Sequence, residues 1–72
     1  MSFLETVTTL GYDALVPVSK IEVIWTTHGQ GGWEIHIKGQ GNFEWVECFG
    51  GDDEKLNTRW LQIKELLGVV GE

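Results

Sequence analysis

The sequence predicts a small α+β domain with the element order αβββα, in which a three-stranded antiparallel meander sheet carries both helices on one face. Three observations lead to this fold class. Apolar and polar residues alternate over 20–26 and 33–38, which is typical of strands. A third alternating stretch over 42–49 follows a glycine-rich turn, and apolar residues repeat at helical spacing after residue 52. The 72 residues suffice for one domain, spanning 1–72.

The first element is predicted to be a helix from Ser2 to Leu10. Ser2 and Glu5 have the spacing of a capping box, in which each side chain bonds the other residue's backbone amide. Phe3, Val7 and Leu10 then fall on one helical face. Because residues 6–9 are β-branched and lower helix propensity, this helix should depend on packing against the sheet.

Residues 12–18 are predicted to connect this helix to the sheet. Pro17 favours an extended conformation at Val16, the residue before it. Leu15, Val16 and Val18 are too apolar for a free linker, so we expect the segment to lie against the core.

The glycine-rich turns set the predicted register of the sheet. Residues 27–32 form a connection longer than a tight turn, whereas Gly39–Gly41 fits a three-residue hairpin loop that places Lys38 opposite Asn42. A four-residue turn would reverse the third strand and place Phe43 and Trp45 outside. We favour the shorter turn because it buries both aromatic rings. The predicted core face consists of Ile21, Val23, Trp25, Trp33, Ile35, Ile37, Phe43 and Trp45.

A second helix is predicted to begin after the glycine pair at 50–51 and to end at Gly68. Asp52, Asp53 and Glu54 place negative charge at its N-terminus, where the helix dipole favours it. An apolar stripe faces the core, consisting of Leu56, Trp60, Ile63 and Leu67. Leu61 lies off this stripe.

The predicted order resembles that of the double-stranded-RNA-binding domain. Its last four elements also resemble the three-strand-plus-helix domains of plant AP2 factors and phage-integrase arm-binding modules. The resemblance is one of topology and implies nucleic-acid binding. However, residues 52–55 (Asp-Asp-Glu-Lys) stand where the RNA-binding family has a lysine-rich helix start. The outer sheet face carries Glu22, Glu34 and Glu44, where the AP2-type sheet presents arginines.

Charge and composition narrow the function classes. Eleven acidic and five basic residues give a formal charge of −6, which argues against a nucleic-acid binder and against docking on an anionic membrane. With Cys48 as its single cysteine, the chain cannot form an intrachain disulfide. The first residues lack a cationic, apolar leader and no apolar run approaches about 20 residues, so we expect a cytoplasmic protein.

Two groups of side chains are candidates for a catalytic or metal-binding role. The predicted register places Glu22, His36 and Glu44 side by side on the outer face, as a weak metal site, a general acid–base group or a solvated cross-strand charge ladder. Cys48 with His36 or His28 is either a nucleophile with its base or a small hydrophobic residue. We favour the charge ladder and the hydrophobic residue, and expect no enzyme activity, no metal and no cofactor.

These observations predict a small acidic, non-catalytic protein-interaction module, of the accessory or inhibitory kind found in phages and mobile elements. We expect it to bind a basic surface on another protein. We also expect a homodimer, formed by pairing of the open sheet edges or by stacking of the partly apolar outer faces. The alternative is a nucleic-acid-binding module. The predicted partner-binding residues are Ile24, His36, Glu22, Glu44, Val46, Cys48 and Leu61.

Overall fold

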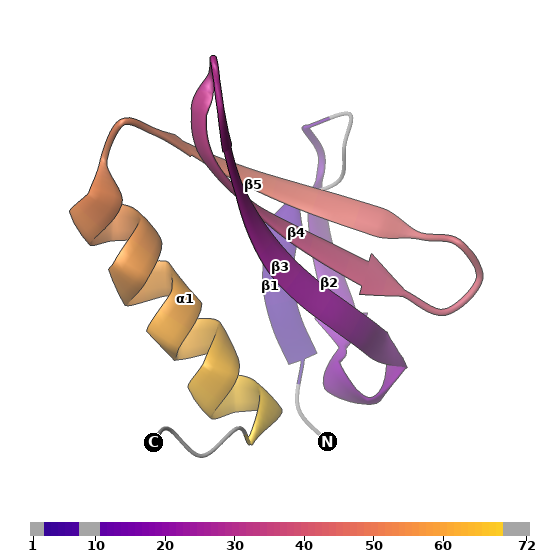
Figure 1. Cartoon of the computed structure of the whole chain (residues 1–72). Coiled ribbons are helices and arrows are strands. Elements are labelled where there is room, and N and C mark those ends of the chain that lie inside the picture. Colours follow the sequence, from indigo (N-terminus) through magenta and orange to yellow (C-terminus); the bar gives the residue numbers. More distant parts are fainter. Residues whose placement is uncertain (1–2, 8–10, 69–72) are drawn as a thin grey trace.

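The computed structural model describes residues 3–7 and 11–68 and shows an α+β fold (Figure 1). Two short strands, β1 and β2, precede a 3₁₀-helix, η1, and a group of three strands, β3 to β5, followed by the helix α1. The bounds are Phe3–Val7 for β1, Asp13–Pro17 for β2, Val18–Lys20 for η1, Ile21–Gly29 for β3, Gly32–Gly39 for β4, Glu44–Gly50 for β5 and Asp53–Leu67 for α1.

The predicted three-stranded antiparallel meander is confirmed. Its strands lie in the order β3-β4-β5, and each pairs antiparallel with its neighbour in sequence. The strands β1 and β2 form a separate two-stranded antiparallel sheet, in which Leu4 lies opposite Val16. The segment predicted as an apolar connector is therefore partly a strand.

The prediction of a first helix is wrong, because residues 3–7 form β1. Leu4 and Thr6 are buried, at 2% and 4% exposure, while Phe3 and Glu5, which alternate with them, are exposed. This period of two belongs to a strand, and the helical interpretation required Phe3 on the buried side. Ser2 and Leu10, the ends of the predicted helix, lie outside the described residues.

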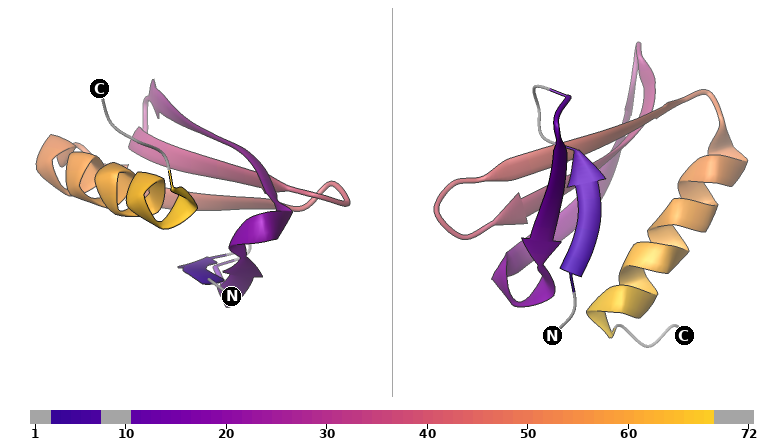
Figure 2. Two further views of the ribbon diagram at one scale, coloured as in Figure 1. Left: turned by 90° about the horizontal axis from the view of Figure 1, so that it is seen from below. Right: turned by 180° about the vertical axis from the view of Figure 1, so that it is seen from behind.

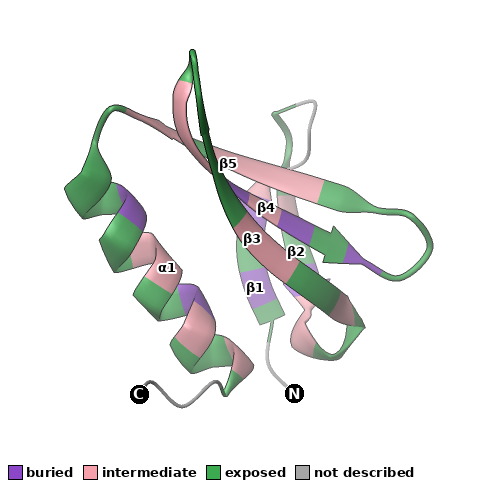
Figure 3. Cartoon of the chain, in the orientation of Figure 1, coloured by how far each residue is buried: buried purple, intermediate pink, exposed green. Residues whose placement is uncertain are grey.

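One face of the three-stranded sheet is covered by a helix and a hairpin rather than by two helices. The right view of Figure 2 shows the β1–β2 hairpin in front of the sheet, with α1 beside it. Side chains from all three parts meet in one core, which Figure 3 shows as buried segments on β1, β4 and α1. Its buried members are Leu4, Ile35, Ile37, Leu56 and Ile63.

A β-bulge between Ile21 and Val23 reverses the faces predicted for β3. Val23 and Trp25, predicted for the core, lie on the outer face, and Val23 is 45% exposed. Ile24, predicted to bind a partner, packs instead against the core. The alternation could not reveal the extra residue, because the segment is apolar on both faces.

The pairing of β4 with β5 differs from the predicted register by two residues. Lys38 lies opposite Glu44 rather than Asn42. Because a shift of two leaves every side chain on its predicted face, Trp45 packs half-buried against the core as expected. Phe43 falls in the loop before β5, is 62% exposed and is not a core residue.

The connection between β3 and β4 is shorter than predicted. The strands extend until Gly29 lies opposite Gly32, so Gln30 and Gly31 alone join them. Gly32 has a positive φ of 96°, and a Cβ there would collide with the carbonyl group of Gly50. A residue without a side chain is therefore required where the end of β5 crosses this hairpin.

The predicted main helix is confirmed at both ends. The Asp52 side chain caps its N-terminus by accepting a hydrogen bond from the Lys55 amide at 3.0 Å, and Gly68 ends it with a φ of 80°. The apolar stripe packs on the core with Leu56, Trp60, Ile63 and Leu67. α1 is the only α-helix among the described residues. At 15 residues it is too short and too polar to cross a membrane.

Candidate functional site: the outer face of the sheet

The face of the sheet opposite the core carries three rows of side chains, which we call the outer face. Each row runs across β3, β4 and β5, so that one residue from each strand lies beside the next. The rows are Val23, Lys38 and Glu44; Trp25, His36 and Val46; and Thr27, Glu34 and Cys48. The hairpin and α1 pack on the other side, which leaves this face open among the described residues.

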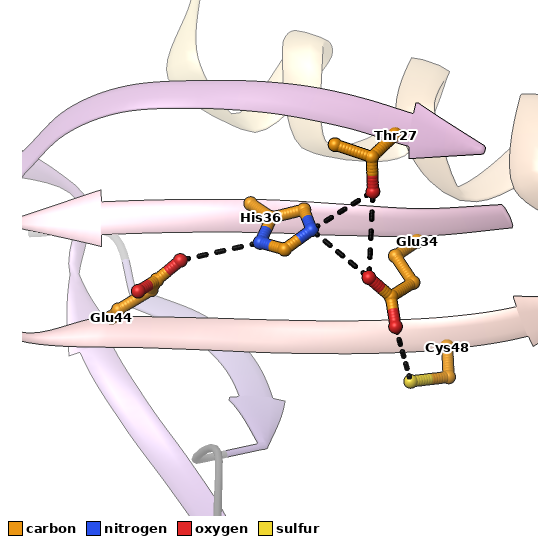
Figure 4. Close-up of polar contacts among 5 residues, drawn as sticks. All are labelled: Thr27, Glu34, His36, Glu44 and Cys48. Carbon is orange, nitrogen blue, oxygen red and sulfur yellow. Dashed lines mark hydrogen bonds and ion pairs between the residues drawn. The ribbon is translucent and has the colours of Figure 1, made fainter. Parts of the chain in front are cut away.

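His36 lies at the centre of the outer face and contacts four neighbours, Trp25 and the three polar residues Thr27, Glu34 and Glu44 that Figure 4 draws around it. Its ring stacks on that of Trp25, with centroids 5.0 Å apart and planes 10° from parallel. Its Nδ1 lies 3.2 Å from Oε2 of Glu44, and its Nε2 lies 3.1 Å from Oε1 of Glu34 and 3.0 Å from Oγ1 of Thr27. These contacts leave its side chain 17% exposed, so the imidazole is fixed in position and orientation.

The hydrogen bonds of the imidazole depend on its charge state, because a neutral ring carries one N–H group and can donate to only one of the two carboxylates. When His36 is protonated, both ring nitrogens donate, one to Glu34 and one to Glu44. When it is neutral, the nitrogen without a proton accepts from a donor, and the Thr27 hydroxyl is 3.0 Å from Nε2. The protonated ring therefore holds two carboxylates at defined positions on the open face.

Cys48 is coupled to this cluster through a carboxylate and not through the imidazole. Its Sγ donates to Oε2 of Glu34 at 3.7 Å. Burial raises the pKa of the Cys48 thiol, and the charge and hydrogen bond of Glu34 raise it further. A nucleophilic cysteine needs a lowered pKa and a base in reach. The geometry therefore opposes the interpretation of Cys48 and His36 as a nucleophile and its base.

The structure brings together part of the predicted charge ladder. Glu44 lies beside His36 as predicted, but the second carboxylate is Glu34 and not Glu22. Glu22 lies at the β-bulge and is exposed, because the bulge takes it out of the row of His36. Glu34 was predicted on the outer face, as part of the charge ladder, but not as a partner-binding residue. It precedes His36 by two residues, the spacing that places two side chains on one face of a strand.

The remaining predicted partner-binding residues divide between the outer face and the helix. Val46 lies directly beside His36, and Cys48 lies one row further along the outer face. Leu61 is exposed at 56% on α1, which packs against the opposite side of the sheet. Trp25 was missed as an outer-face residue because the unrecognised bulge reversed β3. Among the described residues, no three His, Cys, Asp or Glu side chains are arranged to hold a metal ion.

A second polar cluster, on the core side, was also missed. Glu47 of β5 lies opposite Ile35 on the covered face, and its carboxylate accepts from Arg59 Nε at 2.7 Å and Nη2 at 2.8 Å. Thr6 Oγ1 donates to the same carboxylate at 2.8 Å, and Arg59 Nη2 donates to the Glu5 carbonyl at 2.6 Å. The hydrogen bond to Glu47 raises the pKa of Arg59 above its ordinary value. The cluster joins β1, β5 and α1.

The topology that resembled the double-stranded-RNA-binding domain required an N-terminal helix, and the structure has the β1–β2 hairpin there. The elements β3 to α1 keep the three-strand-plus-helix order, but their open face carries Glu34 and Glu44. In comparisons with known proteins, the chain matches no protein-family model, no curated protein and no solved structure.

Proposed function

We propose that the chain is a non-catalytic protein-binding module whose outer face binds an arginine-bearing surface of a partner protein. One observation carries the proposal. The open face of the sheet is centred on an ordered array, in which Trp25 stacks on His36 and His36 holds the carboxylates of Glu34 and Glu44. Tryptophan and arginine are the residues most enriched at the energetic centres of protein interfaces.

The chemistry of the array matches a guanidinium group. Arginine stacks on aromatic faces and bonds carboxylates with two parallel N–H groups. Trp25 offers an indole ring, and Glu34 and Glu44 offer carboxylates that remain 38% and 45% exposed. Val23 and Val46 add apolar surface on either side of this centre. Because the side chains are already ordered by one another, binding would cost little side-chain entropy.

The overall charge supports the same partner class. A formal charge of −6 on 72 residues attracts a basic surface and repels nucleic-acid phosphates. A small acidic module of this kind suits an accessory or inhibitory role, in which it covers a basic site on a larger protein. Catalysis is not part of the proposal, because the raised pKa of Cys48 disfavours the thiolate that covalent chemistry requires.

The proposal includes a homodimer formed through β3. Among the described strands, β3 and β5 are the edges of the three-stranded sheet, and β1 lies beside β5. Neither outer edge pairs with another described strand, and the proposal takes the edge of β3 because β1 packs near β5. Pairing of two β3 strands about a twofold axis would continue the sheet and leave both outer faces available to a partner.

The test is an NMR titration with a tetra-arginine peptide. We expect amide shifts at residues 23–27, 34–38 and 44–48, and weaker binding by about tenfold in the double variant Glu34→Gln/Glu44→Gln, since each carboxylate forms a charge-assisted bond. The matched control Glu54→Gln/Glu65→Gln removes the same charge from exposed positions of α1 and should bind within about twofold of wild type.

Two further probes separate the alternatives. Tetra-citrulline keeps the shape of the peptide without its charge and should not bind. A short RNA duplex should cause no shifts at low salt, since phosphates would meet the two carboxylates. Equal weakening in both double variants, or shifts spread over the acidic start of α1, would show that only general charge attraction is at work. Tight duplex binding on the outer face would favour the nucleic-acid alternative.

A further inference from the structure

A groove of about 480 Å³ lies on the other side of the molecule, between β2 and the loop that joins β4 to β5. Its lining consists of residues 14–17, Lys20, Gln40, Gly41, Phe43 and Trp45. The volume falls within the roughly 300–1,000 Å³ range of small-molecule sites, which are mostly apolar with a few polar groups that orient the ligand. Lys20 is the charged residue of this lining.

Contacts between the two walls fix the shape of the groove. The Lys20 carbonyl accepts from the Gln40 amide at 3.0 Å, which ties η1 to the β4–β5 loop. The Trp45 ring occupies the space left by Gly39, where a Cβ would lie 2.8 Å from it. Phe43 stacks on Trp45, with ring centroids 6.1 Å apart. The aromatic wall is therefore held by packing and does not depend on a ligand.

The groove exposes apolar surface next to an unpaired cation. Leu15 and Phe43 are 67% and 62% exposed, although both are large apolar side chains on so small a domain. Within the described residues, no carboxylate forms an ion pair with Lys20, even though acidic residues outnumber basic ones eleven to five in the chain. A ligand that carries both an apolar part and a negative charge would match this surface.

We propose that this groove binds a free fatty acid of medium chain length. Its carboxylate would bond the Lys20 ammonium group, and its acyl chain would lie against Leu15, Phe43 and Trp45. Charge complementarity favours the carboxylate, because it can form a charge-assisted hydrogen bond with the exposed Lys20 ammonium group, whereas a cation is repelled by that group. Burial of the chain removes apolar surface of ligand and protein from water together. This site is distinct from the outer face and does not depend on its function.

The experiment is a titration with decanoate below its micellar concentration, followed by NMR and by calorimetry. We expect amide shifts at residues 14–17, 20 and 40–45, and binding weaker by about tenfold in Lys20→Gln. The matched control Lys38→Gln removes an exposed lysine from the outer face and should bind decanoate as wild type does. Phe43→Ser, at an exposed loop position, should keep the fold and weaken binding through the acyl chain.

Two related probes decide whether the head group matters. Decan-1-ol should bind more weakly than decanoate by about the same factor as the Lys20→Gln change, and decyltrimethylammonium should not bind in the groove. If decanoate shifts other residues, if Lys20→Gln has no effect, or if the ammonium compound binds equally well, the groove is not a carboxylate site and the proposal is wrong. A tetra-arginine titration unchanged by decanoate would show that the two sites are independent.

Discussion

Arg59 on α1 holds Glu47 on β5 with two nearly parallel hydrogen bonds, 2.7 Å from Nε to Oε1 and 2.8 Å from Nη2 to Oε2. Their side chains are 26% and 13% exposed, so the pair lies largely inside the domain. Thr6 and the Glu5 carbonyl complete the contacts from β1. This polar cluster of Arg59, Glu47, Thr6 and the Glu5 carbonyl, which we call the clamp, attaches both the helix and the β1–β2 hairpin to the sheet.

Replacing Arg59 with methionine should destabilise the domain by about 2–3 kcal/mol, somewhat less than the 3–5 kcal/mol typical of a fully buried pair. The reason is that Glu47 would remain partly buried without its partner. Urea unfolding followed by tryptophan fluorescence measures the change. Lys55→Met, at an exposed position of the same helix, should stay within about 0.5 kcal/mol of wild type. Similar losses in both variants would show that the clamp adds nothing.

Trp60→Ala should cost about 2–3 kcal/mol, because Trp60 packs against the core from α1 while remaining partly exposed. The neighbouring Leu61 is 56% exposed and provides the matched control. Leu61→Ala should change the free energy of unfolding by no more than about 0.5 kcal/mol. Thermal unfolding by circular dichroism compares the two variants. A melting temperature for Trp60→Ala as close to wild type as that of Leu61→Ala would contradict the packing of α1.

Gly32→Ala should be among the most damaging substitutions in the sheet. A Cβ at Gly32 would collide with the Gly50 backbone, and its φ of 96° is strained for a residue with a side chain. We expect a loss of more than about 2 kcal/mol. Gly31→Ala is the control, since a Cβ at Gly31 meets nothing within 4 Å. Thermal melts should rank Gly32→Ala well below Gly31→Ala, and equal stability would mean that β5 does not cross the hairpin so closely.

Cys48 should react slowly with iodoacetamide at pH 8, with a pH–rate midpoint above the usual thiol value of 9.0, because burial and Glu34 raise its pKa. The raised pKa also makes the stability of the folded state depend on pH. The folded state holds the thiol proton more tightly, so stability is retained below the unfolded pKa and declines as pH rises toward the folded pKa. Glu34→Gln removes the charge that raises this pKa and should speed alkylation at pH 8, whereas Glu54→Gln should not. An unchanged alkylation rate in Glu34→Gln would show that Glu34 does not raise the pKa of Cys48.

The chain should sediment as a dimer at high protein concentration, and the affinity of the two copies for each other should increase as salt is added. Salt screens the repulsion between two acidic copies, each with a formal charge of −6. Sedimentation equilibrium over a range of protein and salt concentrations tests this expectation. A single 8.1 kDa species throughout would exclude the β3 dimer. It would leave the proposal for the outer face intact, since that face does not require a second copy.

The sequence by itself determined the meander sheet and the main helix. The alternation in β4, the cap at Asp52, the stripe that begins at Leu56 and the stop at Gly68 are local signals, and each agrees with the fold. Local signals also placed His36, Glu44 and Val46 on the outer face, because side-chain alternation within a strand does not depend on distant contacts.

Only the tertiary structure decided the rest. Phe3 and Val7 are four residues apart, a spacing that fits one face of a helix and also one face of a strand. The choice depends on what β2 and the core can pair with and bury. The bulge at Glu22 is a property of pairing with β4, and it moves Trp25 to the outer face and Ile24 to the core. The clamp of Arg59 on Glu47 joins residues whose charges, read along the chain, resemble ordinary surface charges. Burial and pairing between distant segments fix these features, and no local pattern contains them.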